Sequence, residues 1–182
     1  MDNDTIKTYS YRISQATRSQ LVVITYDIIT DYLNEAMKIA GTMADSTRTA
    51  DDTDGYKETY EADYKNAGRK EYNEDIHMAM RGIDQLITGL DMNYEMSVQL
   101  FQLYNYMKRS LISVQISADC DKLKEITGML GRLRAAFLEV SRQDDSQPLM
   151  KNTEKVYSGL TYSRYGANET AQDTLGNRGY KV

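Results

Sequence analysis

The chain has 182 residues, of which 15 are Tyr and 2 are Phe, with no Trp and a single Pro. Its formal net charge is −5, so it has no general electrostatic attraction for nucleic acid or an anionic membrane. No stretch approaches the roughly 20 apolar residues of a membrane span, and the acidic start lacks the apolar core of a secretory signal. Cys120 is the only cysteine, which excludes an intrachain disulfide. We therefore expect a cytoplasmic protein of one domain with appendages.

Residues 1–147 contain no proline and are rich in helix-forming residues, which predicts an all-α fold. The first expected helix begins at Thr17, where the Thr17 hydroxyl and the Gln20 amide have the spacing of a capping box. Its apolar residues recur at intervals of three and four, as one core-facing stripe requires. This predicted stripe consists of Leu21, Ile24, Ile28, Tyr32 or Leu33, Ala36, and Ile39 or Ala40.

Three more helices are expected, over residues 72–90, from residue 94 to about 116, and from Asp119 to about 141. The second carries an apolar face from Ile76 to Leu90, and Asp119 has the chemistry of an N-cap for the last. The connections between these helices are short, which favours antiparallel neighbours. The sequence thus predicts an antiparallel up-down four-helix bundle.

Two segments fall outside these four helices. Residues 45–70 are acidic, yet Tyr56, Tyr60 and Tyr64 repeat every four residues, and Gly68 is expected to interrupt the segment. This insertion is predicted to be an extra helical hairpin arm, or an extension that packs weakly on the first or second helix. A Tyr-lined contact surface for a partner is the alternative. Residues 143–182 contain the single proline and four glycines without helical periodicity. They are predicted to form a flexible tail, or a strap that lays its tyrosines on the bundle.

The expected third helix has an unusual apolar face. Its core stripe combines Leu, Tyr and Met side chains at spacings of three and four: Met96, Leu100, Leu103, Tyr104, Met107, Leu111 and Val114. Phe101 and Tyr106 lie off this stripe, so their aromatic surface is available to a partner.

Motifs for catalysis are almost absent. Glu74 and His77 have the Glu-x-x-His spacing of di-iron bundles, but such a site needs two of these motifs and His77 is the only histidine. One His and one Cys cannot build a catalytic triad, and no glycine-rich phosphate loop precedes a helix. We therefore expect no enzyme, cofactor or metal site. Met and Tyr side chains adapt to apolar partners, so the favoured function is the binding of an amphipathic helix in a groove.

Two blocks of sequence carry a family resemblance. The first block comprises Ala16-Thr17, Leu21, Tyr26-Asp27 and Ala36; the second comprises Leu103-Tyr104-Asn105-Tyr106-Met107 and Leu111. Together they resemble the first helix and the Leu-Tyr-Asp-Tyr-Met helix of the FliS-type flagellar export chaperones, over roughly residues 9–141 apart from residues 45–70. Arg18 stands where that family usually has proline, and Phe137 where it often has Trp.

The resemblance implies a cytosolic antiparallel helical bundle that binds the C-terminal segment of newly made flagellin. Such a chaperone keeps its client from polymerising and supports delivery to the flagellar export apparatus. In some members the N-terminal segment covers the client groove. Here Tyr9, Tyr11 and Ile13 alternate, so an extended segment would present all three to the bundle.

These arguments predict a bundle domain over residues 1–142 and a tail over residues 143–182, with flagellin as the partner and no membrane insertion. An adaptor that binds an amphipathic helix of a non-flagellar protein is the alternative function. The predicted partner-binding residues are Tyr9, Tyr11, Ile13, Phe101, Tyr104, Tyr106 and Met107.

Overall fold

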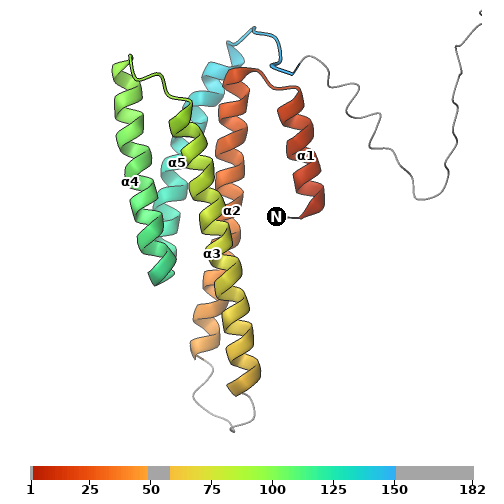
Figure 1. Ribbon diagram of the computed structural model, residues 1–182, viewed down its shortest axis with the longest axis vertical. Coiled ribbons are helices and arrows are strands. Elements are labelled where there is room, and N and C mark those ends of the chain that lie inside the picture. The colour runs from red at the N-terminus through yellow and green to blue at the C-terminus, as the bar shows by residue number, and fades with distance from the viewer. Residues whose placement is uncertain (1, 49–57, 151–182) are drawn as a thin grey trace, which may run out of the picture. The chain divides into compact units, whose positions relative to one another are not determined.

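The structure, a computed structural model, describes residues 2–48 and 58–150, with side chains described for residues 2–44 and 66–150. The described residues form five helices and no strands, so the all-α prediction is confirmed. The helices are α1 (Asn3–Ser14), α2 (Arg18–Arg48), α3 (Glu58–Thr88), α4 (Glu95–Ser117) and α5 (Cys120–Arg142). Each helix runs opposite to the preceding one (Figure 1). The sequence predicted four helices, and α1 is the one that it missed.

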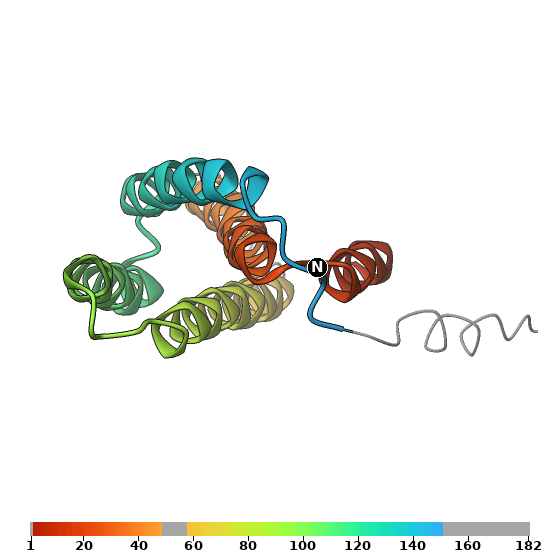
Figure 2. The ribbon, with the colours of Figure 1, turned by 90° about the horizontal axis from the view of Figure 1, so that it is seen from above.

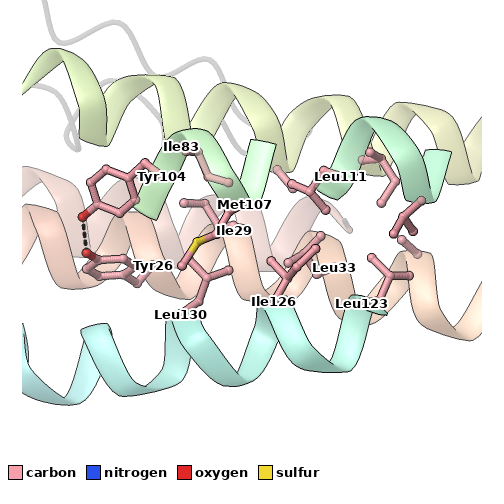
Figure 3. Packing of buried hydrophobic residues seen from close by; sticks show 14 of the residues in the cluster. Tyr26, Ile29, Leu33, Ile83, Tyr104, Met107, Leu111, Leu123, Ile126 and Leu130 are labelled. Atoms are coloured by element: carbon pink, nitrogen blue, oxygen red, sulfur yellow. Dashed lines mark hydrogen bonds between the residues drawn. The ribbon is translucent and has the colours of Figure 1, made fainter. Parts of the chain in front are cut away.

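Helices α2 to α5 surround one interior, and α1 lies outside it beside α2 (Figure 2). Helix α2 packs against α3 and α5, and α4 completes the ring by packing against the same two helices. The buried residues alternate in steps of three and four along each helix, which keeps one seam turned toward its neighbours. On α2 this seam is Tyr26, Ile29, Leu33, Ala36 and Ala40; on α4 it is Tyr104, Met107, Leu111 and Val114. Figure 3 shows the larger of these side chains packed together between the helices.

The seam of α2 differs in part from the predicted stripe. Leu33, Ala36 and Ala40 are buried as expected, but Ile24 belongs to a second cluster, and Leu21 and Ile28 pack against that cluster. The reason is that the first half of α2 is apolar on more than one side, so a single stripe does not describe it. One face contacts the interior of the α2–α5 ring, and the other contacts α1.

The predicted caps are confirmed. The Thr17 backbone N–H donates to Gln20 Oε1 (3.0 Å), and the Gln20 backbone N–H donates to Thr17 Oγ1 (3.3 Å). Asp119 caps α5 by accepting from the backbone N–H groups of Asp121 and Lys122. Between α4 and α5, Ala118 adopts a left-handed conformation (φ 52°), and its N–H donates to Val114 O. This ends α4 at the predicted break.

The acidic insertion is not a separate helix in the residues that the structure describes. Residues 45–48 continue α2, and residues 58–70 are the first part of α3. Gly68 does not interrupt α3, since the helix passes through it beside Ile39 and Met43 of α2. The side chains of Tyr56, Tyr60 and Tyr64 lie outside the described residues, as does the tail from residue 151 onward.

Candidate partner-binding surface

Helix α1 carries three of the predicted partner-binding residues, and their expected extended conformation is wrong. Asp2 caps the helix by accepting from the Thr5 backbone N–H (2.8 Å). Residues two apart on a helix point about 200° apart, so Tyr9 and Tyr11 face opposite sides. Tyr9 is buried, Tyr11 is 51% exposed, and Ile13 is partly buried. The Asp2 cap and the four-residue spacing of Tyr9 and Ile13 are the signals that would have predicted the helix.

The apolar contact between α1 and α2 forms a small cluster of its own, separate from the main core. Tyr9, Ala16 and Ile24 are its buried members, and Ile13, Leu21 and Ile28 pack against them. Among the described helices α1 packs chiefly on α2, and this contact is small beside those that α2 makes with α3 and α5. An apolar face of α2 is therefore covered by a helix that adds nothing to the main core.

Two polar contacts flank this cluster. The Tyr9 hydroxyl donates to Asp31 Oδ2 (2.6 Å), and Arg12 donates to Asp27 Oδ2 (2.6 Å). The other Asp27 oxygen, Oδ1, accepts from Arg134 Nε of α5. The Arg12 guanidinium also lies over the Tyr9 ring, 5.3 Å from its centroid. Asp27 thus joins α1, α2 and α5 in one ion-pair network.

The titration of these groups reflects their pairing. Burial raises the pKa of the Asp27 carboxyl, but hydrogen bonds and charges from Arg134 and Arg12 outweigh burial and leave its pKa below the ordinary value. Burial, followed by the hydrogen bond to Asp31, raises the pKa of the Tyr9 hydroxyl. At neutral pH Asp27 is therefore a carboxylate and Tyr9 a neutral donor.

The segment after α5 returns to the junction between α1 and α2. Asp144 accepts hydrogen bonds from the Ser19 hydroxyl and from the Ser19 backbone N–H (3.4 Å). The backbone N–H of Leu149 donates to Ala16 O (3.2 Å). Hydrogen bonds from Ser146, and then from Ser19 and Thr17, lower the pKa of Asp144 well below its ordinary value. A groove of about 610 Å³ lies beside this junction, with Tyr11, Val23 and Leu138 among its lining residues.

Helix α4 holds the other four predicted residues, and two of them belong to the core. Met107 is fully buried, and Tyr104 is 1% exposed, with its hydroxyl hydrogen-bonded to that of Tyr26 (Figure 3). Burial raises the pKa of both hydroxyls. Tyr104 and Met107 offer no surface to a partner as folded, so we correct their assignment to a packing role. The stripe position Met96 is the converse case, since it is 65% exposed.

Phe101 and Tyr106 are both exposed, at 37% and 43%, but they do not form one patch. Five residues along a helix correspond to about 140° of rotation, so the two rings lie on different sides of α4. Tyr106 faces α5, where its hydroxyl lies 3.4 Å from Glu125 Oε1 and its ring lines a groove of about 320 Å³. Phe101 shares the outer side of α4 with exposed apolar residues that the sequence reading missed: Tyr94, Val98, Ile112 and Ile116.

His77, the candidate for a metal site, lies on the surface of α3 and contacts the side-chain amide of Gln115 (2.9 Å). Among the described residues, no group of three or more His, Cys, Asp or Glu side chains is arranged to hold a metal ion. None of the helices, over the part of the chain that the structure describes, has the length and apolar character needed to cross a membrane.

Comparison with known proteins identifies the family. No curated protein matches the chain. A family model described as flagellar protein FliS matches residues 2–144, which include all five helices and the Asp144 contact with the start of α2. The chain therefore belongs to the FliS flagellar protein family.

Proposed function

We propose that this protein is a cytoplasmic export chaperone that binds the C-terminal helical segment of flagellin. By covering that segment it prevents premature polymerisation and supports delivery of the client to the flagellar export apparatus. The action is stoichiometric binding, without catalysis, cofactor or nucleic acid. In this proposal α2 to α5 form an antiparallel four-helix bundle that serves as the scaffold for the client.

The observation that carries the proposal is the separate α1–α2 cluster. An amphipathic helix already occupies the apolar face of α2 formed by Leu21, Ile24 and Ile28. Such a surface accepts a helix by burying apolar side chains, and a client helix can replace α1 in the same manner. Tyr9 and Ile13 would then act as parts of a lid whose place the client takes.

A lid of this size is suited to displacement. Helix α1 has 12 residues, a length at which isolated helices are marginal in water. Since client binding requires the open form, the lid lowers the apparent affinity by the fraction of molecules that are open. Tyr11, Phe101 and Tyr106 remain exposed on other sides of the molecule and are proposed as further client contacts.

Calorimetric titration of the full-length protein with a flagellin C-terminal peptide tests this function. We expect saturable binding with one peptide per chain, and about three- to tenfold tighter binding after deletion of residues 1–13. A scrambled peptide of the same composition is the control. If the flagellin peptide does not bind, the chaperone proposal is wrong, and binding of an unrelated amphipathic helix would instead favour an adaptor.

A further inference from the structure

The polar groups around the covered face of α2 have a regular geometry. Asp27 and Asp31 lie one turn apart on α2, on the side that meets α1. Helix α1 supplies one donor to each: Arg12 reaches Asp27 and, three residues earlier, Tyr9 reaches Asp31. The pairs run in opposite chain directions, so α1 lies antiparallel to α2. The covered surface is thus an apolar strip with two acceptors at a fixed spacing.

Departure of α1 would leave Asp27 with one of its two hydrogen-bond partners. Asp27 would keep Arg134 on Oδ1, but its Oδ2 would lose Arg12. With α1 in place the Asp27 side chain is only 13% exposed, so a helix in this position shields it from water. An apolar helix without a donor would therefore remove water from a carboxylate oxygen without supplying a hydrogen bond in its place. A buried acceptor left unpaired is costly, most of all when it is charged.

We propose that this strip selects a client helix that carries an Arg or Lys, which replaces Arg12 at Asp27. The helix runs antiparallel to α2 and places a hydrogen-bond donor for Asp31 three residues before that basic residue, with an apolar residue beside them. Helix α1 itself carries the pattern that we propose for the client helix, in the form Tyr9-x-x-Arg12-Ile13. The inference rests on the proposed function, because it requires that the client enters the place of α1.

The charge distribution supports a basic occupant. Arg134 already satisfies one oxygen of Asp27, so a second cation there repeats the arrangement that the free protein has. An Arg or a Lys also makes a shorter and stronger hydrogen bond to a carboxylate oxygen than a neutral donor does. An acidic client residue in this position would face Asp27 and Asp31 together and be rejected.

A double-mutant cycle tests the pairing. The full-length Arg12→Gln variant is the background, so Asp27 has no α1 partner in any sample. A flagellin C-terminal peptide and versions with each Arg or Lys changed singly to Gln are titrated against this background and against the same chain with Asp27→Asn. We expect one basic residue whose loss weakens binding about tenfold with Asp27 present and less than about twofold with Asp27→Asn.

Two further variants make the result specific. With Asp31→Asn in the same background, the cycle should instead show coupling to a peptide residue that donates a hydrogen bond and lies three residues before that basic residue. Asp84→Asn is the matched control, because Asp84 is an exposed carboxylate of α3 paired with Lys108, away from α1. It should show no coupling to any peptide residue. Circular dichroism establishes that each variant is folded.

The outcomes separate the two proposals. Peptide binding in which no basic residue couples to Asp27 would overturn the inference and leave the chaperone function standing. Coupling of equal size at Asp84 would also overturn it, because the effect would then be general attraction to an acidic protein. Absence of peptide binding to the parent chain would overturn the chaperone function, and the selection of its client with it.

Discussion

The main core and the α1–α2 contact are built from different proportions of apolar and polar interaction. Among the side chains that the structure describes, the main core joins four helices through 17 buried residues, whereas the α1–α2 cluster has three. The α1–α2 cluster depends on Asp27 and Asp31 for its polar pairing. Elements with few buried contacts open at a small fraction of the energy of global unfolding. The difference indicates that α1 can leave its place while α2 to α5 stay folded.

The largest expected effect distinguishes the two regions directly. Leu111 is fully buried in the main core, and Leu111→Ala should lower the free energy of unfolding by about 2–5 kcal/mol through lost burial and a cavity. Ile13→Ala, in the α1 cluster, should change the global value by less than about 1 kcal/mol. Urea denaturation followed by circular dichroism measures both.

Hydrogen exchange is the second measurement on Leu111→Ala and Ile13→Ala. Ile13→Ala should speed exchange at the α1 amides and leave those of α4 unchanged. If Ile13→Ala lowered global stability as much as Leu111→Ala, α1 would be an integral part of the core and the lid would be excluded.

A smaller effect concerns the hydroxyl groups of the two regions. Tyr104→Phe leaves the buried Tyr26 hydroxyl without its partner and should cost about 1–3 kcal/mol. The double variant with Tyr26→Phe should cost less than the sum of the single changes, because no hydroxyl is then left unpaired. Tyr9→Phe removes a donor from Asp31 at the edge of the molecule, and its global cost should be below about 1 kcal/mol.

Thermal and urea unfolding of these four variants check this order. Additive costs for Tyr26→Phe and Tyr104→Phe would mean that the two hydroxyls are not mutually satisfied. A larger cost for Tyr9→Phe than for Tyr104→Phe would reverse the comparison of the two regions.

Much of the main core could be predicted because periodicity and caps act locally. The stripe of α4 from Tyr104 to Val114, the Thr17–Gln20 box and the Asp119 cap all depend on residues within a few turns. The helix ends near Arg48 and Glu58 could not be placed, because polar residues continue a helix when another helix lies alongside. Propensity alone does not report that neighbour.

The candidate site was less predictable for a related reason. Alternation in Tyr9-x-Tyr11-x-Ile13 suggested an extended segment, whereas the Asp2 cap and the apolar face of α2 favour a helix. The ion-pair network of Arg12, Asp27 and Arg134 joins residues up to 107 positions apart, and no local pattern indicates it. Tyr104 and Met107 were assigned to a partner from the family resemblance, although their place on the stripe indicated the core.

The smallest expected effect concerns two carboxylates whose pKa values are shifted in opposite directions by the fold. Asp75 of α3 is 8% exposed, and no Lys or Arg of the described residues forms an ion pair with it. Burial, together with the charges of Glu71 and Glu35, raises the pKa of Asp75, whereas Arg134 and Arg12 overcome burial and lower that of Asp27. Ionised Asp75 therefore opposes folding at neutral pH, and ionised Asp27 favours it.

Asp75→Asn should accordingly raise stability at pH 7 by about 1 kcal/mol, or about 2–4 °C in melting temperature, and Asp27→Asn should lower it. The gain from Asp75→Asn should shrink as pH falls through the raised folded-state pKa and vanish below the ordinary value of 3.8, where the carboxyl is protonated in both states. The loss from Asp27→Asn should persist down to 3.8 and disappear only below it, because the folded-state pKa of Asp27 lies lower still. Melting temperatures at pH 7, 5, 4 and 3 measure both windows. A destabilising Asp75→Asn at pH 7 would mean that this carboxylate has a stabilising partner, and the contrast with Asp27 would fail.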